Sequence, residues 1–493
     1  MLMYLWYNTV VLQERMSMSF FGREDLLVDL DALWGKGSAS LITCRGRRRI
    51  GKSTLIRKFA ERSGARYVKI EGLRPEPGFT NEHELTAFAD QLSQQIGRRV
   101  RPQANWLDSF KCLSDGLDDR RTVVLLDEVS WMAHYDETFA AVLKVAWDNF
   151  FKDHDHLILV VCGSVSTWIR ERIIDNKAYY GRRSLDMIVP ELPLCECVRF
   201  WRDRVDKVPL REIIDVLSVT GGVPRYLEEI NPSLTAIENL RQMAFRPNAT
   251  LRVDFDEMFE DVITRSPRMA ARVLEALADG PLTLTELANH FKVEKNGHLT
   301  DALNQLAESG MVSPDVGKNP ETGEDFRERR YRLRDNYSRF YLKCVKPYKT
   351  VIDDGSFRFT SLNQFKEWSG IHGFAFENLV VNHYRELLPF LHLGETAVFS
   401  AAPYRKVARK KGSGLQIDLL IQTRRSLCIV EIKRKRSISK GVVDEVAQKV
   451  VRLKRPKDCS VRAALVYDGK LPPTVSADGY FDAIIPFSAL LGL

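Results

Sequence analysis

Residues 46–53 are the segment whose residue types and spacing point most directly to chemistry. They read Gly-Arg-Arg-Arg-Ile-Gly-Lys-Ser and match the pattern G-x-x-x-x-G-K-[ST] at every fixed position. In this pattern the glycines let the backbone curl, so that its N–H groups point at phosphate oxygens. The lysine reaches the β- and γ-phosphates, and the hydroxyl group binds Mg²⁺. A basic surface turn is the alternative interpretation, and the full match favours a site for ATP and Mg²⁺.

A second segment carries two carboxylates that fit the same reaction. The apolar residues 122–126 end in Asp127 and Glu128, as expected for a strand that is buried on both faces of a parallel sheet. Asp127 would belong to the Mg²⁺ shell, and Glu128 would orient and polarise the attacking water. A helix cap is the alternative for this acidic pair. Another apolar run, residues 157–163, ends at Ser164, which either contacts the γ-phosphate or its water or simply caps the strand.

A third constellation lies near the C-terminus. Asp418 stands in one apolar run, and Glu431 and Lys433 stand in the next. Side chains alternate along a strand, so Glu431 and Lys433 share a face, and Asp418 approaches Glu431 across a hairpin. Two carboxylates for a hard cation and one ammonium group suit phosphodiester hydrolysis, because the metal activates water and the lysine helps to generate the nucleophile.

Two further residues belong to this candidate site. Glu377, on a predicted helix over residues 374–380, adds a third carboxylate, so the expected metal ligands are Glu377, Asp418 and Glu431. Gln448, on the helix that follows the motif, is a further candidate. A cross-strand salt bridge is the alternative interpretation of Asp418, Glu431 and Lys433.

The elements that must position the first site follow the expected order. Residues 40–44 predict a strand before the glycine-rich loop, and residues 54–60 predict a helix after it. Strand, loop and helix in this order place a phosphate at a helix N-terminus. Up to about residue 231 the chain alternates strand-like and helix-like segments, which is typical of an α/β nucleotide-binding domain. Residues 213–220 predict a helix that ends at Gly221 and Gly222.

From about residue 267 the pattern changes to helices followed by a hairpin. Residues 269–277 predict one helix, and residues 282–288 start a second behind a capping threonine. A third amphipathic helix is expected next, and residues 311–312 and 330–333 predict a hairpin. This order resembles a winged helix-turn-helix, which either reads DNA or serves as a packing module. The third helix is marked by Leu299, Leu303, Leu306 and Met311, and its candidate DNA-reading residues are Lys295, Asn296, His298 and Asn304.

Composition limits the class of protein. A chain of 493 residues with 44% hydrophobic and 28% charged residues predicts two to four globular domains. No apolar run is long enough to span a bilayer. Residues 1–12 make a poor signal peptide, and they are either an ordered strand or lie upstream of a start at Met16 or Met18. Eight scattered cysteines without C-x-x-C indicate neither zinc nor disulfides, which favours a cytoplasmic protein.

Positive charge is concentrated in one region. The formal net charge is +8, and residues 401–460 contain 17 Lys and Arg against 5 Asp and Glu. The rest of the chain is therefore slightly acidic. A basic region on an otherwise acidic protein predicts a polyanionic partner, and nucleic acid, in particular DNA, is the partner we expect.

Several short motifs together resemble the archaeal-type ATPases, close to the STAND branch of AAA+ proteins. The likeness extends from about residue 20 to the end of the chain, and the region from about residue 369 resembles the PD-(D/E)XK restriction-endonuclease-like superfamily, with Ile417 in place of its signature proline. The residues that carry the first resemblance are Phe21, Gly22, Arg23, Glu24, Gly51, Lys52, Ser53, Thr54, Leu126, Asp127, Glu128, Gly163, Ser164, Gly181, Arg182, Gly221, Gly222, Val223, Pro224, Arg225, Tyr226, Tyr331, Leu333, Asp335, Arg339 and Phe340.

The resemblance implies a set of nucleotide-binding residues. Gly22 and Arg23 would lie near the adenine, Pro224 would sense the nucleotide from a helical lid, and Arg182 or Arg225 would contact the γ-phosphate. The expected nucleotide-binding set is Gly22, Arg23, Gly46, Arg47, Arg48, Arg49, Ile50, Gly51, Lys52, Ser53, Thr54, Ser164 and Pro224.

The expected architecture is α/β, with a parallel-sheet P-loop ATPase followed by a lid, a winged helix and a small restriction-endonuclease-like domain. The predicted boundaries are residues 1–18 for an extension, 19–190 for the ATPase core, 191–265 for the lid, 266–349 for the winged helix and 350–493 for the last domain.

Three functions follow from this architecture. The first is an ATP-hydrolysing switch that controls a DNA-directed C-terminal domain, with metal-dependent nuclease activity as one form of its output. The second is an ATP-gated regulator that binds DNA or protein without cleavage. The third, a chaperone-like ATPase, explains neither the basic region nor the C-terminal motif. Assembly into an oligomer is left open.

Overall fold

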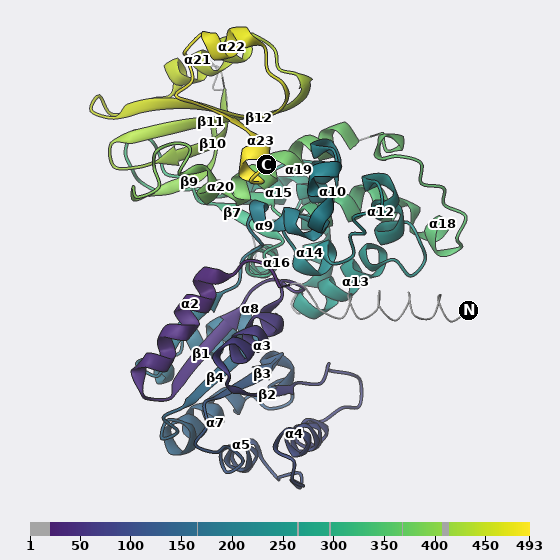
Figure 1. Ribbon diagram of the computed structural model, residues 1–493, viewed down its shortest axis with the longest axis vertical. Helices are drawn as coiled ribbons and strands as arrows, with labels where there is room; N and C mark the ends of the chain where they lie inside the picture. The colour runs from purple at the N-terminus through teal and green to yellow at the C-terminus, as the bar shows by residue number, and fades with distance from the viewer. Residues whose placement is uncertain (1–19, 165, 264–265, 295–296, 367, 407–413) are drawn as a thin grey trace.

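Three sheets and the helices between them make up the molecule. The computed structural model describes residues 20–164, 166–263, 266–294, 297–366, 368–406 and 414–493, so the predictions for residues 1–18, Lys295 and Asn296 lie outside the described residues. A five-stranded sheet lies at each end of the long axis, with most of the helices between them (Figure 1).

The N-terminal sheet is parallel, with the strand order β2-β3-β4-β1-β5. Alternate side chains of its strands enter two different apolar clusters, for example Val123 and Leu125 on one face and Val124 and Leu126 on the other. Such two-sided burial requires continuous apolar strands, as predicted. The strands are β1 (Ser40–Arg45), β2 (Arg66–Glu71), β3 (Thr122–Asp127), β4 (Leu157–Gly163) and β5 (Arg183–Ile188).

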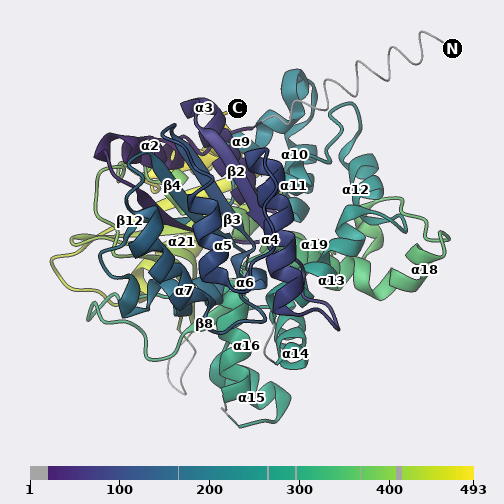
Figure 2. The same cartoon turned by 90° about the horizontal axis from the view of Figure 1, so that it is seen from below.

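Helices cover both faces of this sheet. The helices α2 (Glu24–Leu33) and α3 (Lys52–Ser63) pack on one face. On the other face lie α4 (Asn81–Ile96), α5 (Trp106–Ser114) and α7 (Phe139–Ala146), and α4 and α5 lie side by side near β2 and β3 (Figure 2). Two short helices follow strand ends, α6 (Val129–Met132) after β3 and α8 (Ser166–Ile169) after β4. The sequence therefore predicted the layers of this domain correctly.

A helical segment follows the sheet. Its helices are α9 (Leu194–Cys197), α10 (Leu210–Thr220), α11 (Pro224–Leu227), α12 (Ala236–Ala244) and α13 (Thr250–Val262). The predicted helix over residues 213–220 is confirmed as part of α10. Pro224 occupies the first turn of α11, where its missing N–H costs nothing.

The next unit combines three helices with a small antiparallel sheet of order β6-β8-β7. Its elements are α14 (Pro267–Ala278), β6 (Leu282–Thr283), α15 (Leu284–Phe291), α16 (Gly297–Glu308), β7 (Val312–Asp315) and β8 (Arg330–Leu333). The predicted helices and hairpin are present, with two corrections. Residues 282–283 form a strand, and Thr283 caps the helix that starts after it. Met311 lies beyond α16, because Gly310 adopts a φ of 78° that ends the helical path.

Residues 336–366 form short helices that share a core with the preceding elements. They include α17 (Asn336–Phe340) and α18 (Lys349–Asp353). Phe245, which follows the last residue of α12, packs against three aromatic rings of this segment, those of Phe340, Phe359 and Phe365. The same apolar cluster extends from the N-terminal sheet to Ile371, so these parts pack as one body.

The C-terminal domain is a mixed sheet of order β13-β12-β11-β10-β9, in which β9, β10 and β11 are antiparallel and β11, β12 and β13 are parallel. One face packs against α19 and α10, and the other against α21 and α22. The elements are α19 (Trp368–Asn382), α20 (Tyr384–Leu387), β9 (Ser400–Lys406), β10 (Leu415–Gln422), β11 (Ser426–Ser437), α21 (Val442–Arg452), β12 (Ser460–Lys470), α22 (Pro473–Ala477), β13 (Ala483–Pro486) and α23 (Phe487–Leu490).

The cysteines and the lengths of the helices bear on two further expectations. All eight cysteines are free thiols, as the absence of a disulfide pattern predicted. Across the parts of the chain that the structure describes, none of the helices has the length and apolar character needed to traverse a bilayer.

Candidate nucleotide site and C-terminal cleft

The glycine-rich loop lies at the carboxyl end of β1 and leads into α3, as predicted. Gly46 has a φ of 155° and Gly51 a φ of 85°. A Cβ atom added to Gly46 would lie 2.6 Å from the carbonyl oxygen of Val189, so the loop can follow this path only without a side chain there. The loop geometry fits a phosphate cradle at the N-terminus of α3.

Lys52 is directed back over this loop. Its side chain is buried, and its Nζ donates hydrogen bonds to the carbonyl oxygens of Gly46 at 3.1 Å and Arg47 at 3.2 Å. An ammonium group held by two neutral acceptors retains its full positive charge for an anion. This placement fits the predicted role of Lys52 with the phosphates of ATP.

The predicted Mg²⁺ ligands lie together. Ser53 Oγ donates to Asp127 Oδ2 at 2.6 Å, which joins the start of α3 to the end of β3. Hard oxygen donors of this kind are those that Mg²⁺ takes, so these residues fit the ion. Lys69, which the sequence analysis missed, lies 3.1 Å from the same carboxylate oxygen. Burial would lower the pKa of Lys69, but its contacts with Glu71 and Asp127 raise it above its ordinary value.

Glu128 is oriented by Ser164. The backbone N–H and the hydroxyl of Ser164 donate to Glu128 Oε2 at 3.2 and 2.8 Å. Glu128 adopts a left-handed backbone conformation, with a φ of 47°, between β3 and α6. Ser164 thus contacts the predicted catalytic carboxylate, rather than being a simple strand cap.

Arg23, one of the two residues expected near the adenine, lines a small cavity of about 40 Å³. The other lining residues are mostly apolar and include Phe20, Phe21, Ile50 and Pro224. Arg23 Nη2 donates to the carbonyl oxygen of Ile50 at 3.3 Å. Burial lowers the pKa of Arg23 to about 10. Gly22 and Gly51 lie beside this cavity, and the narrow apolar walls suit the edge of a flat base.

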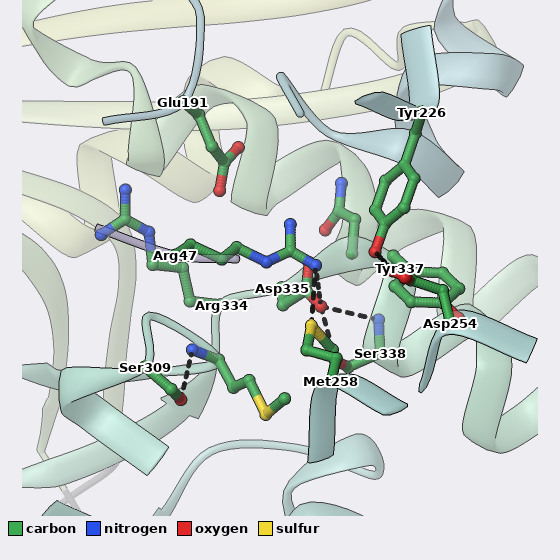
Figure 3. A network of polar contacts seen from close by, with 12 residues as sticks. Arg47, Glu191, Tyr226, Asp254, Met258, Ser309, Arg334, Asp335, Tyr337 and Ser338 are labelled. Carbon is green, nitrogen blue, oxygen red and sulfur yellow. Dashed lines mark hydrogen bonds and ion pairs between the residues drawn. The ribbon is translucent and has the colours of Figure 1, made fainter. Parts of the chain in front are cut away.

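The three loop arginines contact acidic residues far along the chain, and Figure 3 shows the contact of Arg47 with Asp335. Arg47 Nη2 lies 2.8 Å from Asp335 Oδ2, and both side chains are buried. Arg49 pairs with Asp254 at 2.7 Å, and Arg48 lies 3.9 Å from Glu257. Both of these carboxylates are on α13. The loop is therefore tied to α13 and to the segment that follows β8.

The two arginines considered for the γ-phosphate lie in different places. Arg182 precedes β5 and pairs with Asp148 at 2.7 Å. Because β5 is parallel to β1, Arg182 lies at the amino edge of the sheet, opposite the loop. Arg225 follows Pro224 at the start of α11 and pairs with Glu229 at 2.6 Å. Within this chain Arg182 does not reach the nucleotide loop.

The C-terminal constellation forms a charged cleft of about 540 Å³. The buried carboxylate of Glu431 lies 2.6 Å from Lys433 Nζ through one oxygen and 2.6 Å from Lys449 Nζ through the other. Both lysines also lie 3.2 Å from Glu445. Glu445 and Lys449, one helical turn apart on α21, were missed in the sequence analysis, although their i,i+4 spacing was a usable signal. Lys433 and Glu431 share a face, as predicted.

Asp418 and Glu377 border the same cleft. Asp418 Oδ2 accepts a hydrogen bond from the N–H of Ile432 at 3.0 Å. Burial raises the pKa of Asp418 and of Glu431. Burial, reinforced by the negative charge of Asp418, raises the pKa of Glu377 to about 7.

These carboxylates are not arranged as a ready metal centre. Within the described residues, no group of three or more His, Cys, Asp or Glu side chains is placed so that it could hold a metal ion. Glu431 is instead neutralised by two lysines. The three-carboxylate metal site expected from Glu377, Asp418 and Glu431 is therefore not assembled in this arrangement.

Residues 20–230 match a family model described as an ATPase domain predominantly from Archaea. Together with the loop, Asp127 and the parallel sheet, this match identifies an archaeal-type P-loop ATPase domain, as the sequence motifs implied. The match ends before α12, so it covers neither the helix–sheet unit nor the C-terminal domain.

Three other similar proteins match a larger share of the chain than the family model does. An uncharacterized protein of Methanocaldococcus jannaschii is 24% identical over 408 residues, which cover 81% of this chain and 84% of that protein. A Walker-type ATPase of Pyrococcus abyssi is 18% identical, with a TM-score of 0.49, over 66% of this chain and 96% of that one. The Aeropyrum pernix ORC2 protein, in ADPNP–ADP complexes, is 15% identical, with a TM-score of 0.42, over 67% and 93%.

We expect Lys52→Ala to weaken ATP binding by about 10- to 150-fold, because a hydrogen bond to a charged group contributes about 1.5–3 kcal/mol. Titration with a fluorescent ATP analogue measures the affinity. Lys58→Ala is the matched control, since Lys58 lies on the same helix and pairs only with exposed Glu61, at 3.1 Å. Full affinity in Lys52→Ala would refute the assignment.

We expect Glu128→Gln to leave ATP affinity unchanged and to lower steady-state turnover by at least about 100-fold, the usual effect of losing a general base. Release of inorganic phosphate gives the rate. Glu137→Gln, at an exposed position on the same segment, is the control. Turnover that is equal in Glu128→Gln and in the unchanged protein would exclude Glu128 as the base.

Proposed function

We propose that the chain is an ATP-hydrolysing switch whose nucleotide state controls nucleic-acid binding by its C-terminal domain. In this proposal Lys52 binds the phosphates, Glu128 orients the attacking water and accepts its proton, and Ser164 fixes the direction of Glu128. Mg²⁺ held by Ser53 and Asp127 would neutralise charge on the phosphates.

The observation that carries the proposal is the buried ion pair between Arg47 and Asp335. It joins a residue of the phosphate loop to one 288 positions further along the chain. Asp335 also accepts hydrogen bonds from the N–H of Ser338 at 3.0 Å and from its hydroxyl at 2.5 Å, so it caps α17 (Figure 3). A change at the phosphates that alters Arg47 therefore acts directly on the start of α17.

From α17 the contacts continue to the charged cleft. Asn336 Nδ2 donates to the carbonyl oxygen of Ala375 at 3.1 Å, and Asn378 Nδ2 donates to Asn336 Oδ1 at 3.0 Å. Ala375 and Asn378 lie on α19, which also carries Glu377 in the wall of the cleft. Two hydrogen bonds of the neighbouring residue Asn336 thus connect the segment of Asp335 to that wall.

The charge of the cleft supports a nucleic-acid partner. Five cationic side chains line it against four carboxylates, within a region of net positive charge; the cations belong to Lys433, Arg434, Lys435, Lys449 and Arg452. Binding through such side chains releases counterions from the polyanion, so the affinity should fall steeply with salt. Lys435 is exposed and has no ion-pair partner in the described parts of the chain.

For the helix–sheet unit, which we interpret as a winged helix, the contacts favour packing over DNA reading. Glu308 at the end of α16 forms an ion pair with Arg170 next to α8 of the ATPase domain. His298 is bonded to Ser266 at 3.1 Å, and only Asn304 of the described candidates remains exposed without such a contact. In the proposed switch this unit transmits the nucleotide state.

We expect the double variant Arg47→Met/Asp335→Asn to bind ATP and nucleic acid but to lose the effect of ATP on nucleic-acid affinity. Both charges are removed because one charge left unpaired in the interior costs about 3–5 kcal/mol and endangers folding. Fluorescence anisotropy of a labelled oligonucleotide, with and without a non-hydrolysable ATP analogue, measures the coupling.

The control for this variant is Lys318→Met/Asp325→Asn, which removes an exposed ion pair of 2.8 Å from the wing. Thermal unfolding of both variants checks that the fold is retained. An unchanged ATP effect in the Arg47/Asp335 variant would show that the coupling runs elsewhere.

Metal-dependent nuclease activity is the second candidate function. It is favoured by Asp418, Glu431 and Lys433 lying together in one cleft, two of them within an ion pair of 2.6 Å. The competing form of the proposal is a regulator that binds without cleavage, which the pairing of Glu431 with two lysines favours.

If the cleft cleaves DNA, we expect Asp418→Ala to abolish cleavage of labelled linear, circular or single-stranded DNA in Mg²⁺ or Mn²⁺ and to leave ATP turnover unchanged. Asp478→Ala, an exposed carboxylate after α22, is the control. Cleavage that persists in purified Asp418→Ala would exclude this site. No cleavage by any form, together with salt-sensitive binding, would identify the non-cleaving regulator.

A further inference from the structure

A second cavity adjoins the charged cleft on the side of Glu377 and Asp418. This cavity has a volume of about 450 Å³, and it shares Glu377, Gln416 and Asp418 with the first cavity of about 540 Å³. It lies between the helix–sheet unit, α19 and the edge strand β9. The two cavities therefore adjoin at these three residues, two of which are carboxylates, and we call the pair of cavities the passage.

The two sides of this passage differ in chemistry. The first is lined mainly by cationic side chains and the carboxylates beside them. The second combines apolar and aromatic groups with charged side chains that include Arg330, Arg332 and Arg405. Phe374 and Tyr404, from α19 and β9, face it from different elements and are only half-buried. Phe374 lies 4.7 Å from the guanidinium of Arg339, and Tyr404 lies 5.8 Å from Phe326, so neighbouring side chains hold both rings.

A strand of nucleic acid has the same two-sided chemistry. Proteins that bind single strands combine a positively charged path for the phosphates with aromatic side chains on which the bases stack. Cavities of roughly 300–1,000 Å³ enclose ligands of small-molecule size, so each side of this passage suits single nucleotides. A duplex could place a base there only after the base had left the stack, at a cost of a few kcal/mol.

We propose that the passage binds single-stranded nucleic acid, with its backbone along Lys435, Lys449 and Arg452 and an unpaired base between Phe374 and Tyr404. The inference rests on the proposed function, because it assumes that the C-terminal domain binds nucleic acid, and it specifies the substrate class. Lys433 and Lys449 form ion pairs with Glu431 and Glu445. The positive charge available for phosphates therefore comes mainly from Lys435 and Arg452.

The test measures binding by the full-length chain in EDTA, so that no metal-dependent cleavage intervenes. The probes are labelled oligo(dT) and oligo(rU) of about 12 nucleotides, within the usual range of single-strand site sizes, and a blunt DNA duplex of the same length. We expect at least one single strand to bind about tenfold more tightly than the duplex. The ratio of the dT and rU affinities tells DNA from RNA, and either preference supports the inference.

Substitutions that remove one aromatic ring test the base cavity directly. We expect Tyr404→Leu and Phe374→Leu each to weaken single-strand binding by about 5- to 150-fold, the range for losing one stacked base. Their salt dependence should stay unchanged, because the phosphate contacts remain. Phe399→Leu is the matched control, since Phe399 is 54% exposed and lies outside the cavity.

The outcomes separate the inference from the function on which it rests. Equal affinity for single strands and duplex, or single-strand binding that is unchanged in both folded aromatic variants, would overturn the inference and leave the nucleic-acid switch standing. No binding of any probe would remove the proposed function itself. The two variants lie on different elements, and thermal unfolding identifies either one that is misfolded, so the other still decides the question.

Discussion

The buried ion pair between Arg47 and Asp335 is the interaction on which the arrangement of this molecule depends. An ionised side chain in a protein interior costs several kcal/mol unless an opposite charge compensates it. The 2.8 Å contact with Asp335 raises the pKa of Arg47 above its ordinary value although burial opposes this, whereas burial raises the pKa of Asp335. Docking of the second half of the chain therefore stabilises the phosphate loop in this conformation.

This pair belongs to a junction of polar and charged side chains that joins the phosphate loop to α10, α11, α17 and α19. Glu191 lies near Arg47 and Arg334 (Figure 3) and accepts a hydrogen bond at 3.3 Å from the N–H of Gly222, between α10 and α11. His383, at the end of α19, contacts the carbonyl oxygen of Leu192 at 3.1 Å. An apolar junction would be indifferent to a phosphate, whereas charges in a medium of low dielectric constant respond strongly to added negative charge. The composition of the junction thus suits a nucleotide-dependent contact.

The sequence predicted those features that are encoded locally. The loop glycines, Lys52, Ser53 and the strand ending at Asp127 lie within short segments whose spacing has a direct geometric meaning. The partner of Arg47 was beyond such reasoning, because nothing in the periodicity around residue 47 or residue 335 specifies a contact between them. The pairing of Glu431 with Lys449 could not be predicted for the same reason, because it depends on how α21 packs on the sheet. Met311 was misplaced for a local reason, because Gly310 already signalled the end of α16.

The position of α19 explains how a change at the loop can alter the cleft. The floor of the cleft is formed by β10 and β11, whose apolar side chains are buried on both faces of the C-terminal sheet. Its wall is α19, which is bonded to Asn336 next to Asp335. Densely packed sheets resist small deformations, whereas a helix that is hydrogen-bonded to Asn336 at Ala375 and Asn378 can shift with that residue. Movement of Asp335 would therefore displace Glu377 and Phe374 relative to Asp418, and would change the width of the passage without disturbing the strands that carry its charged residues.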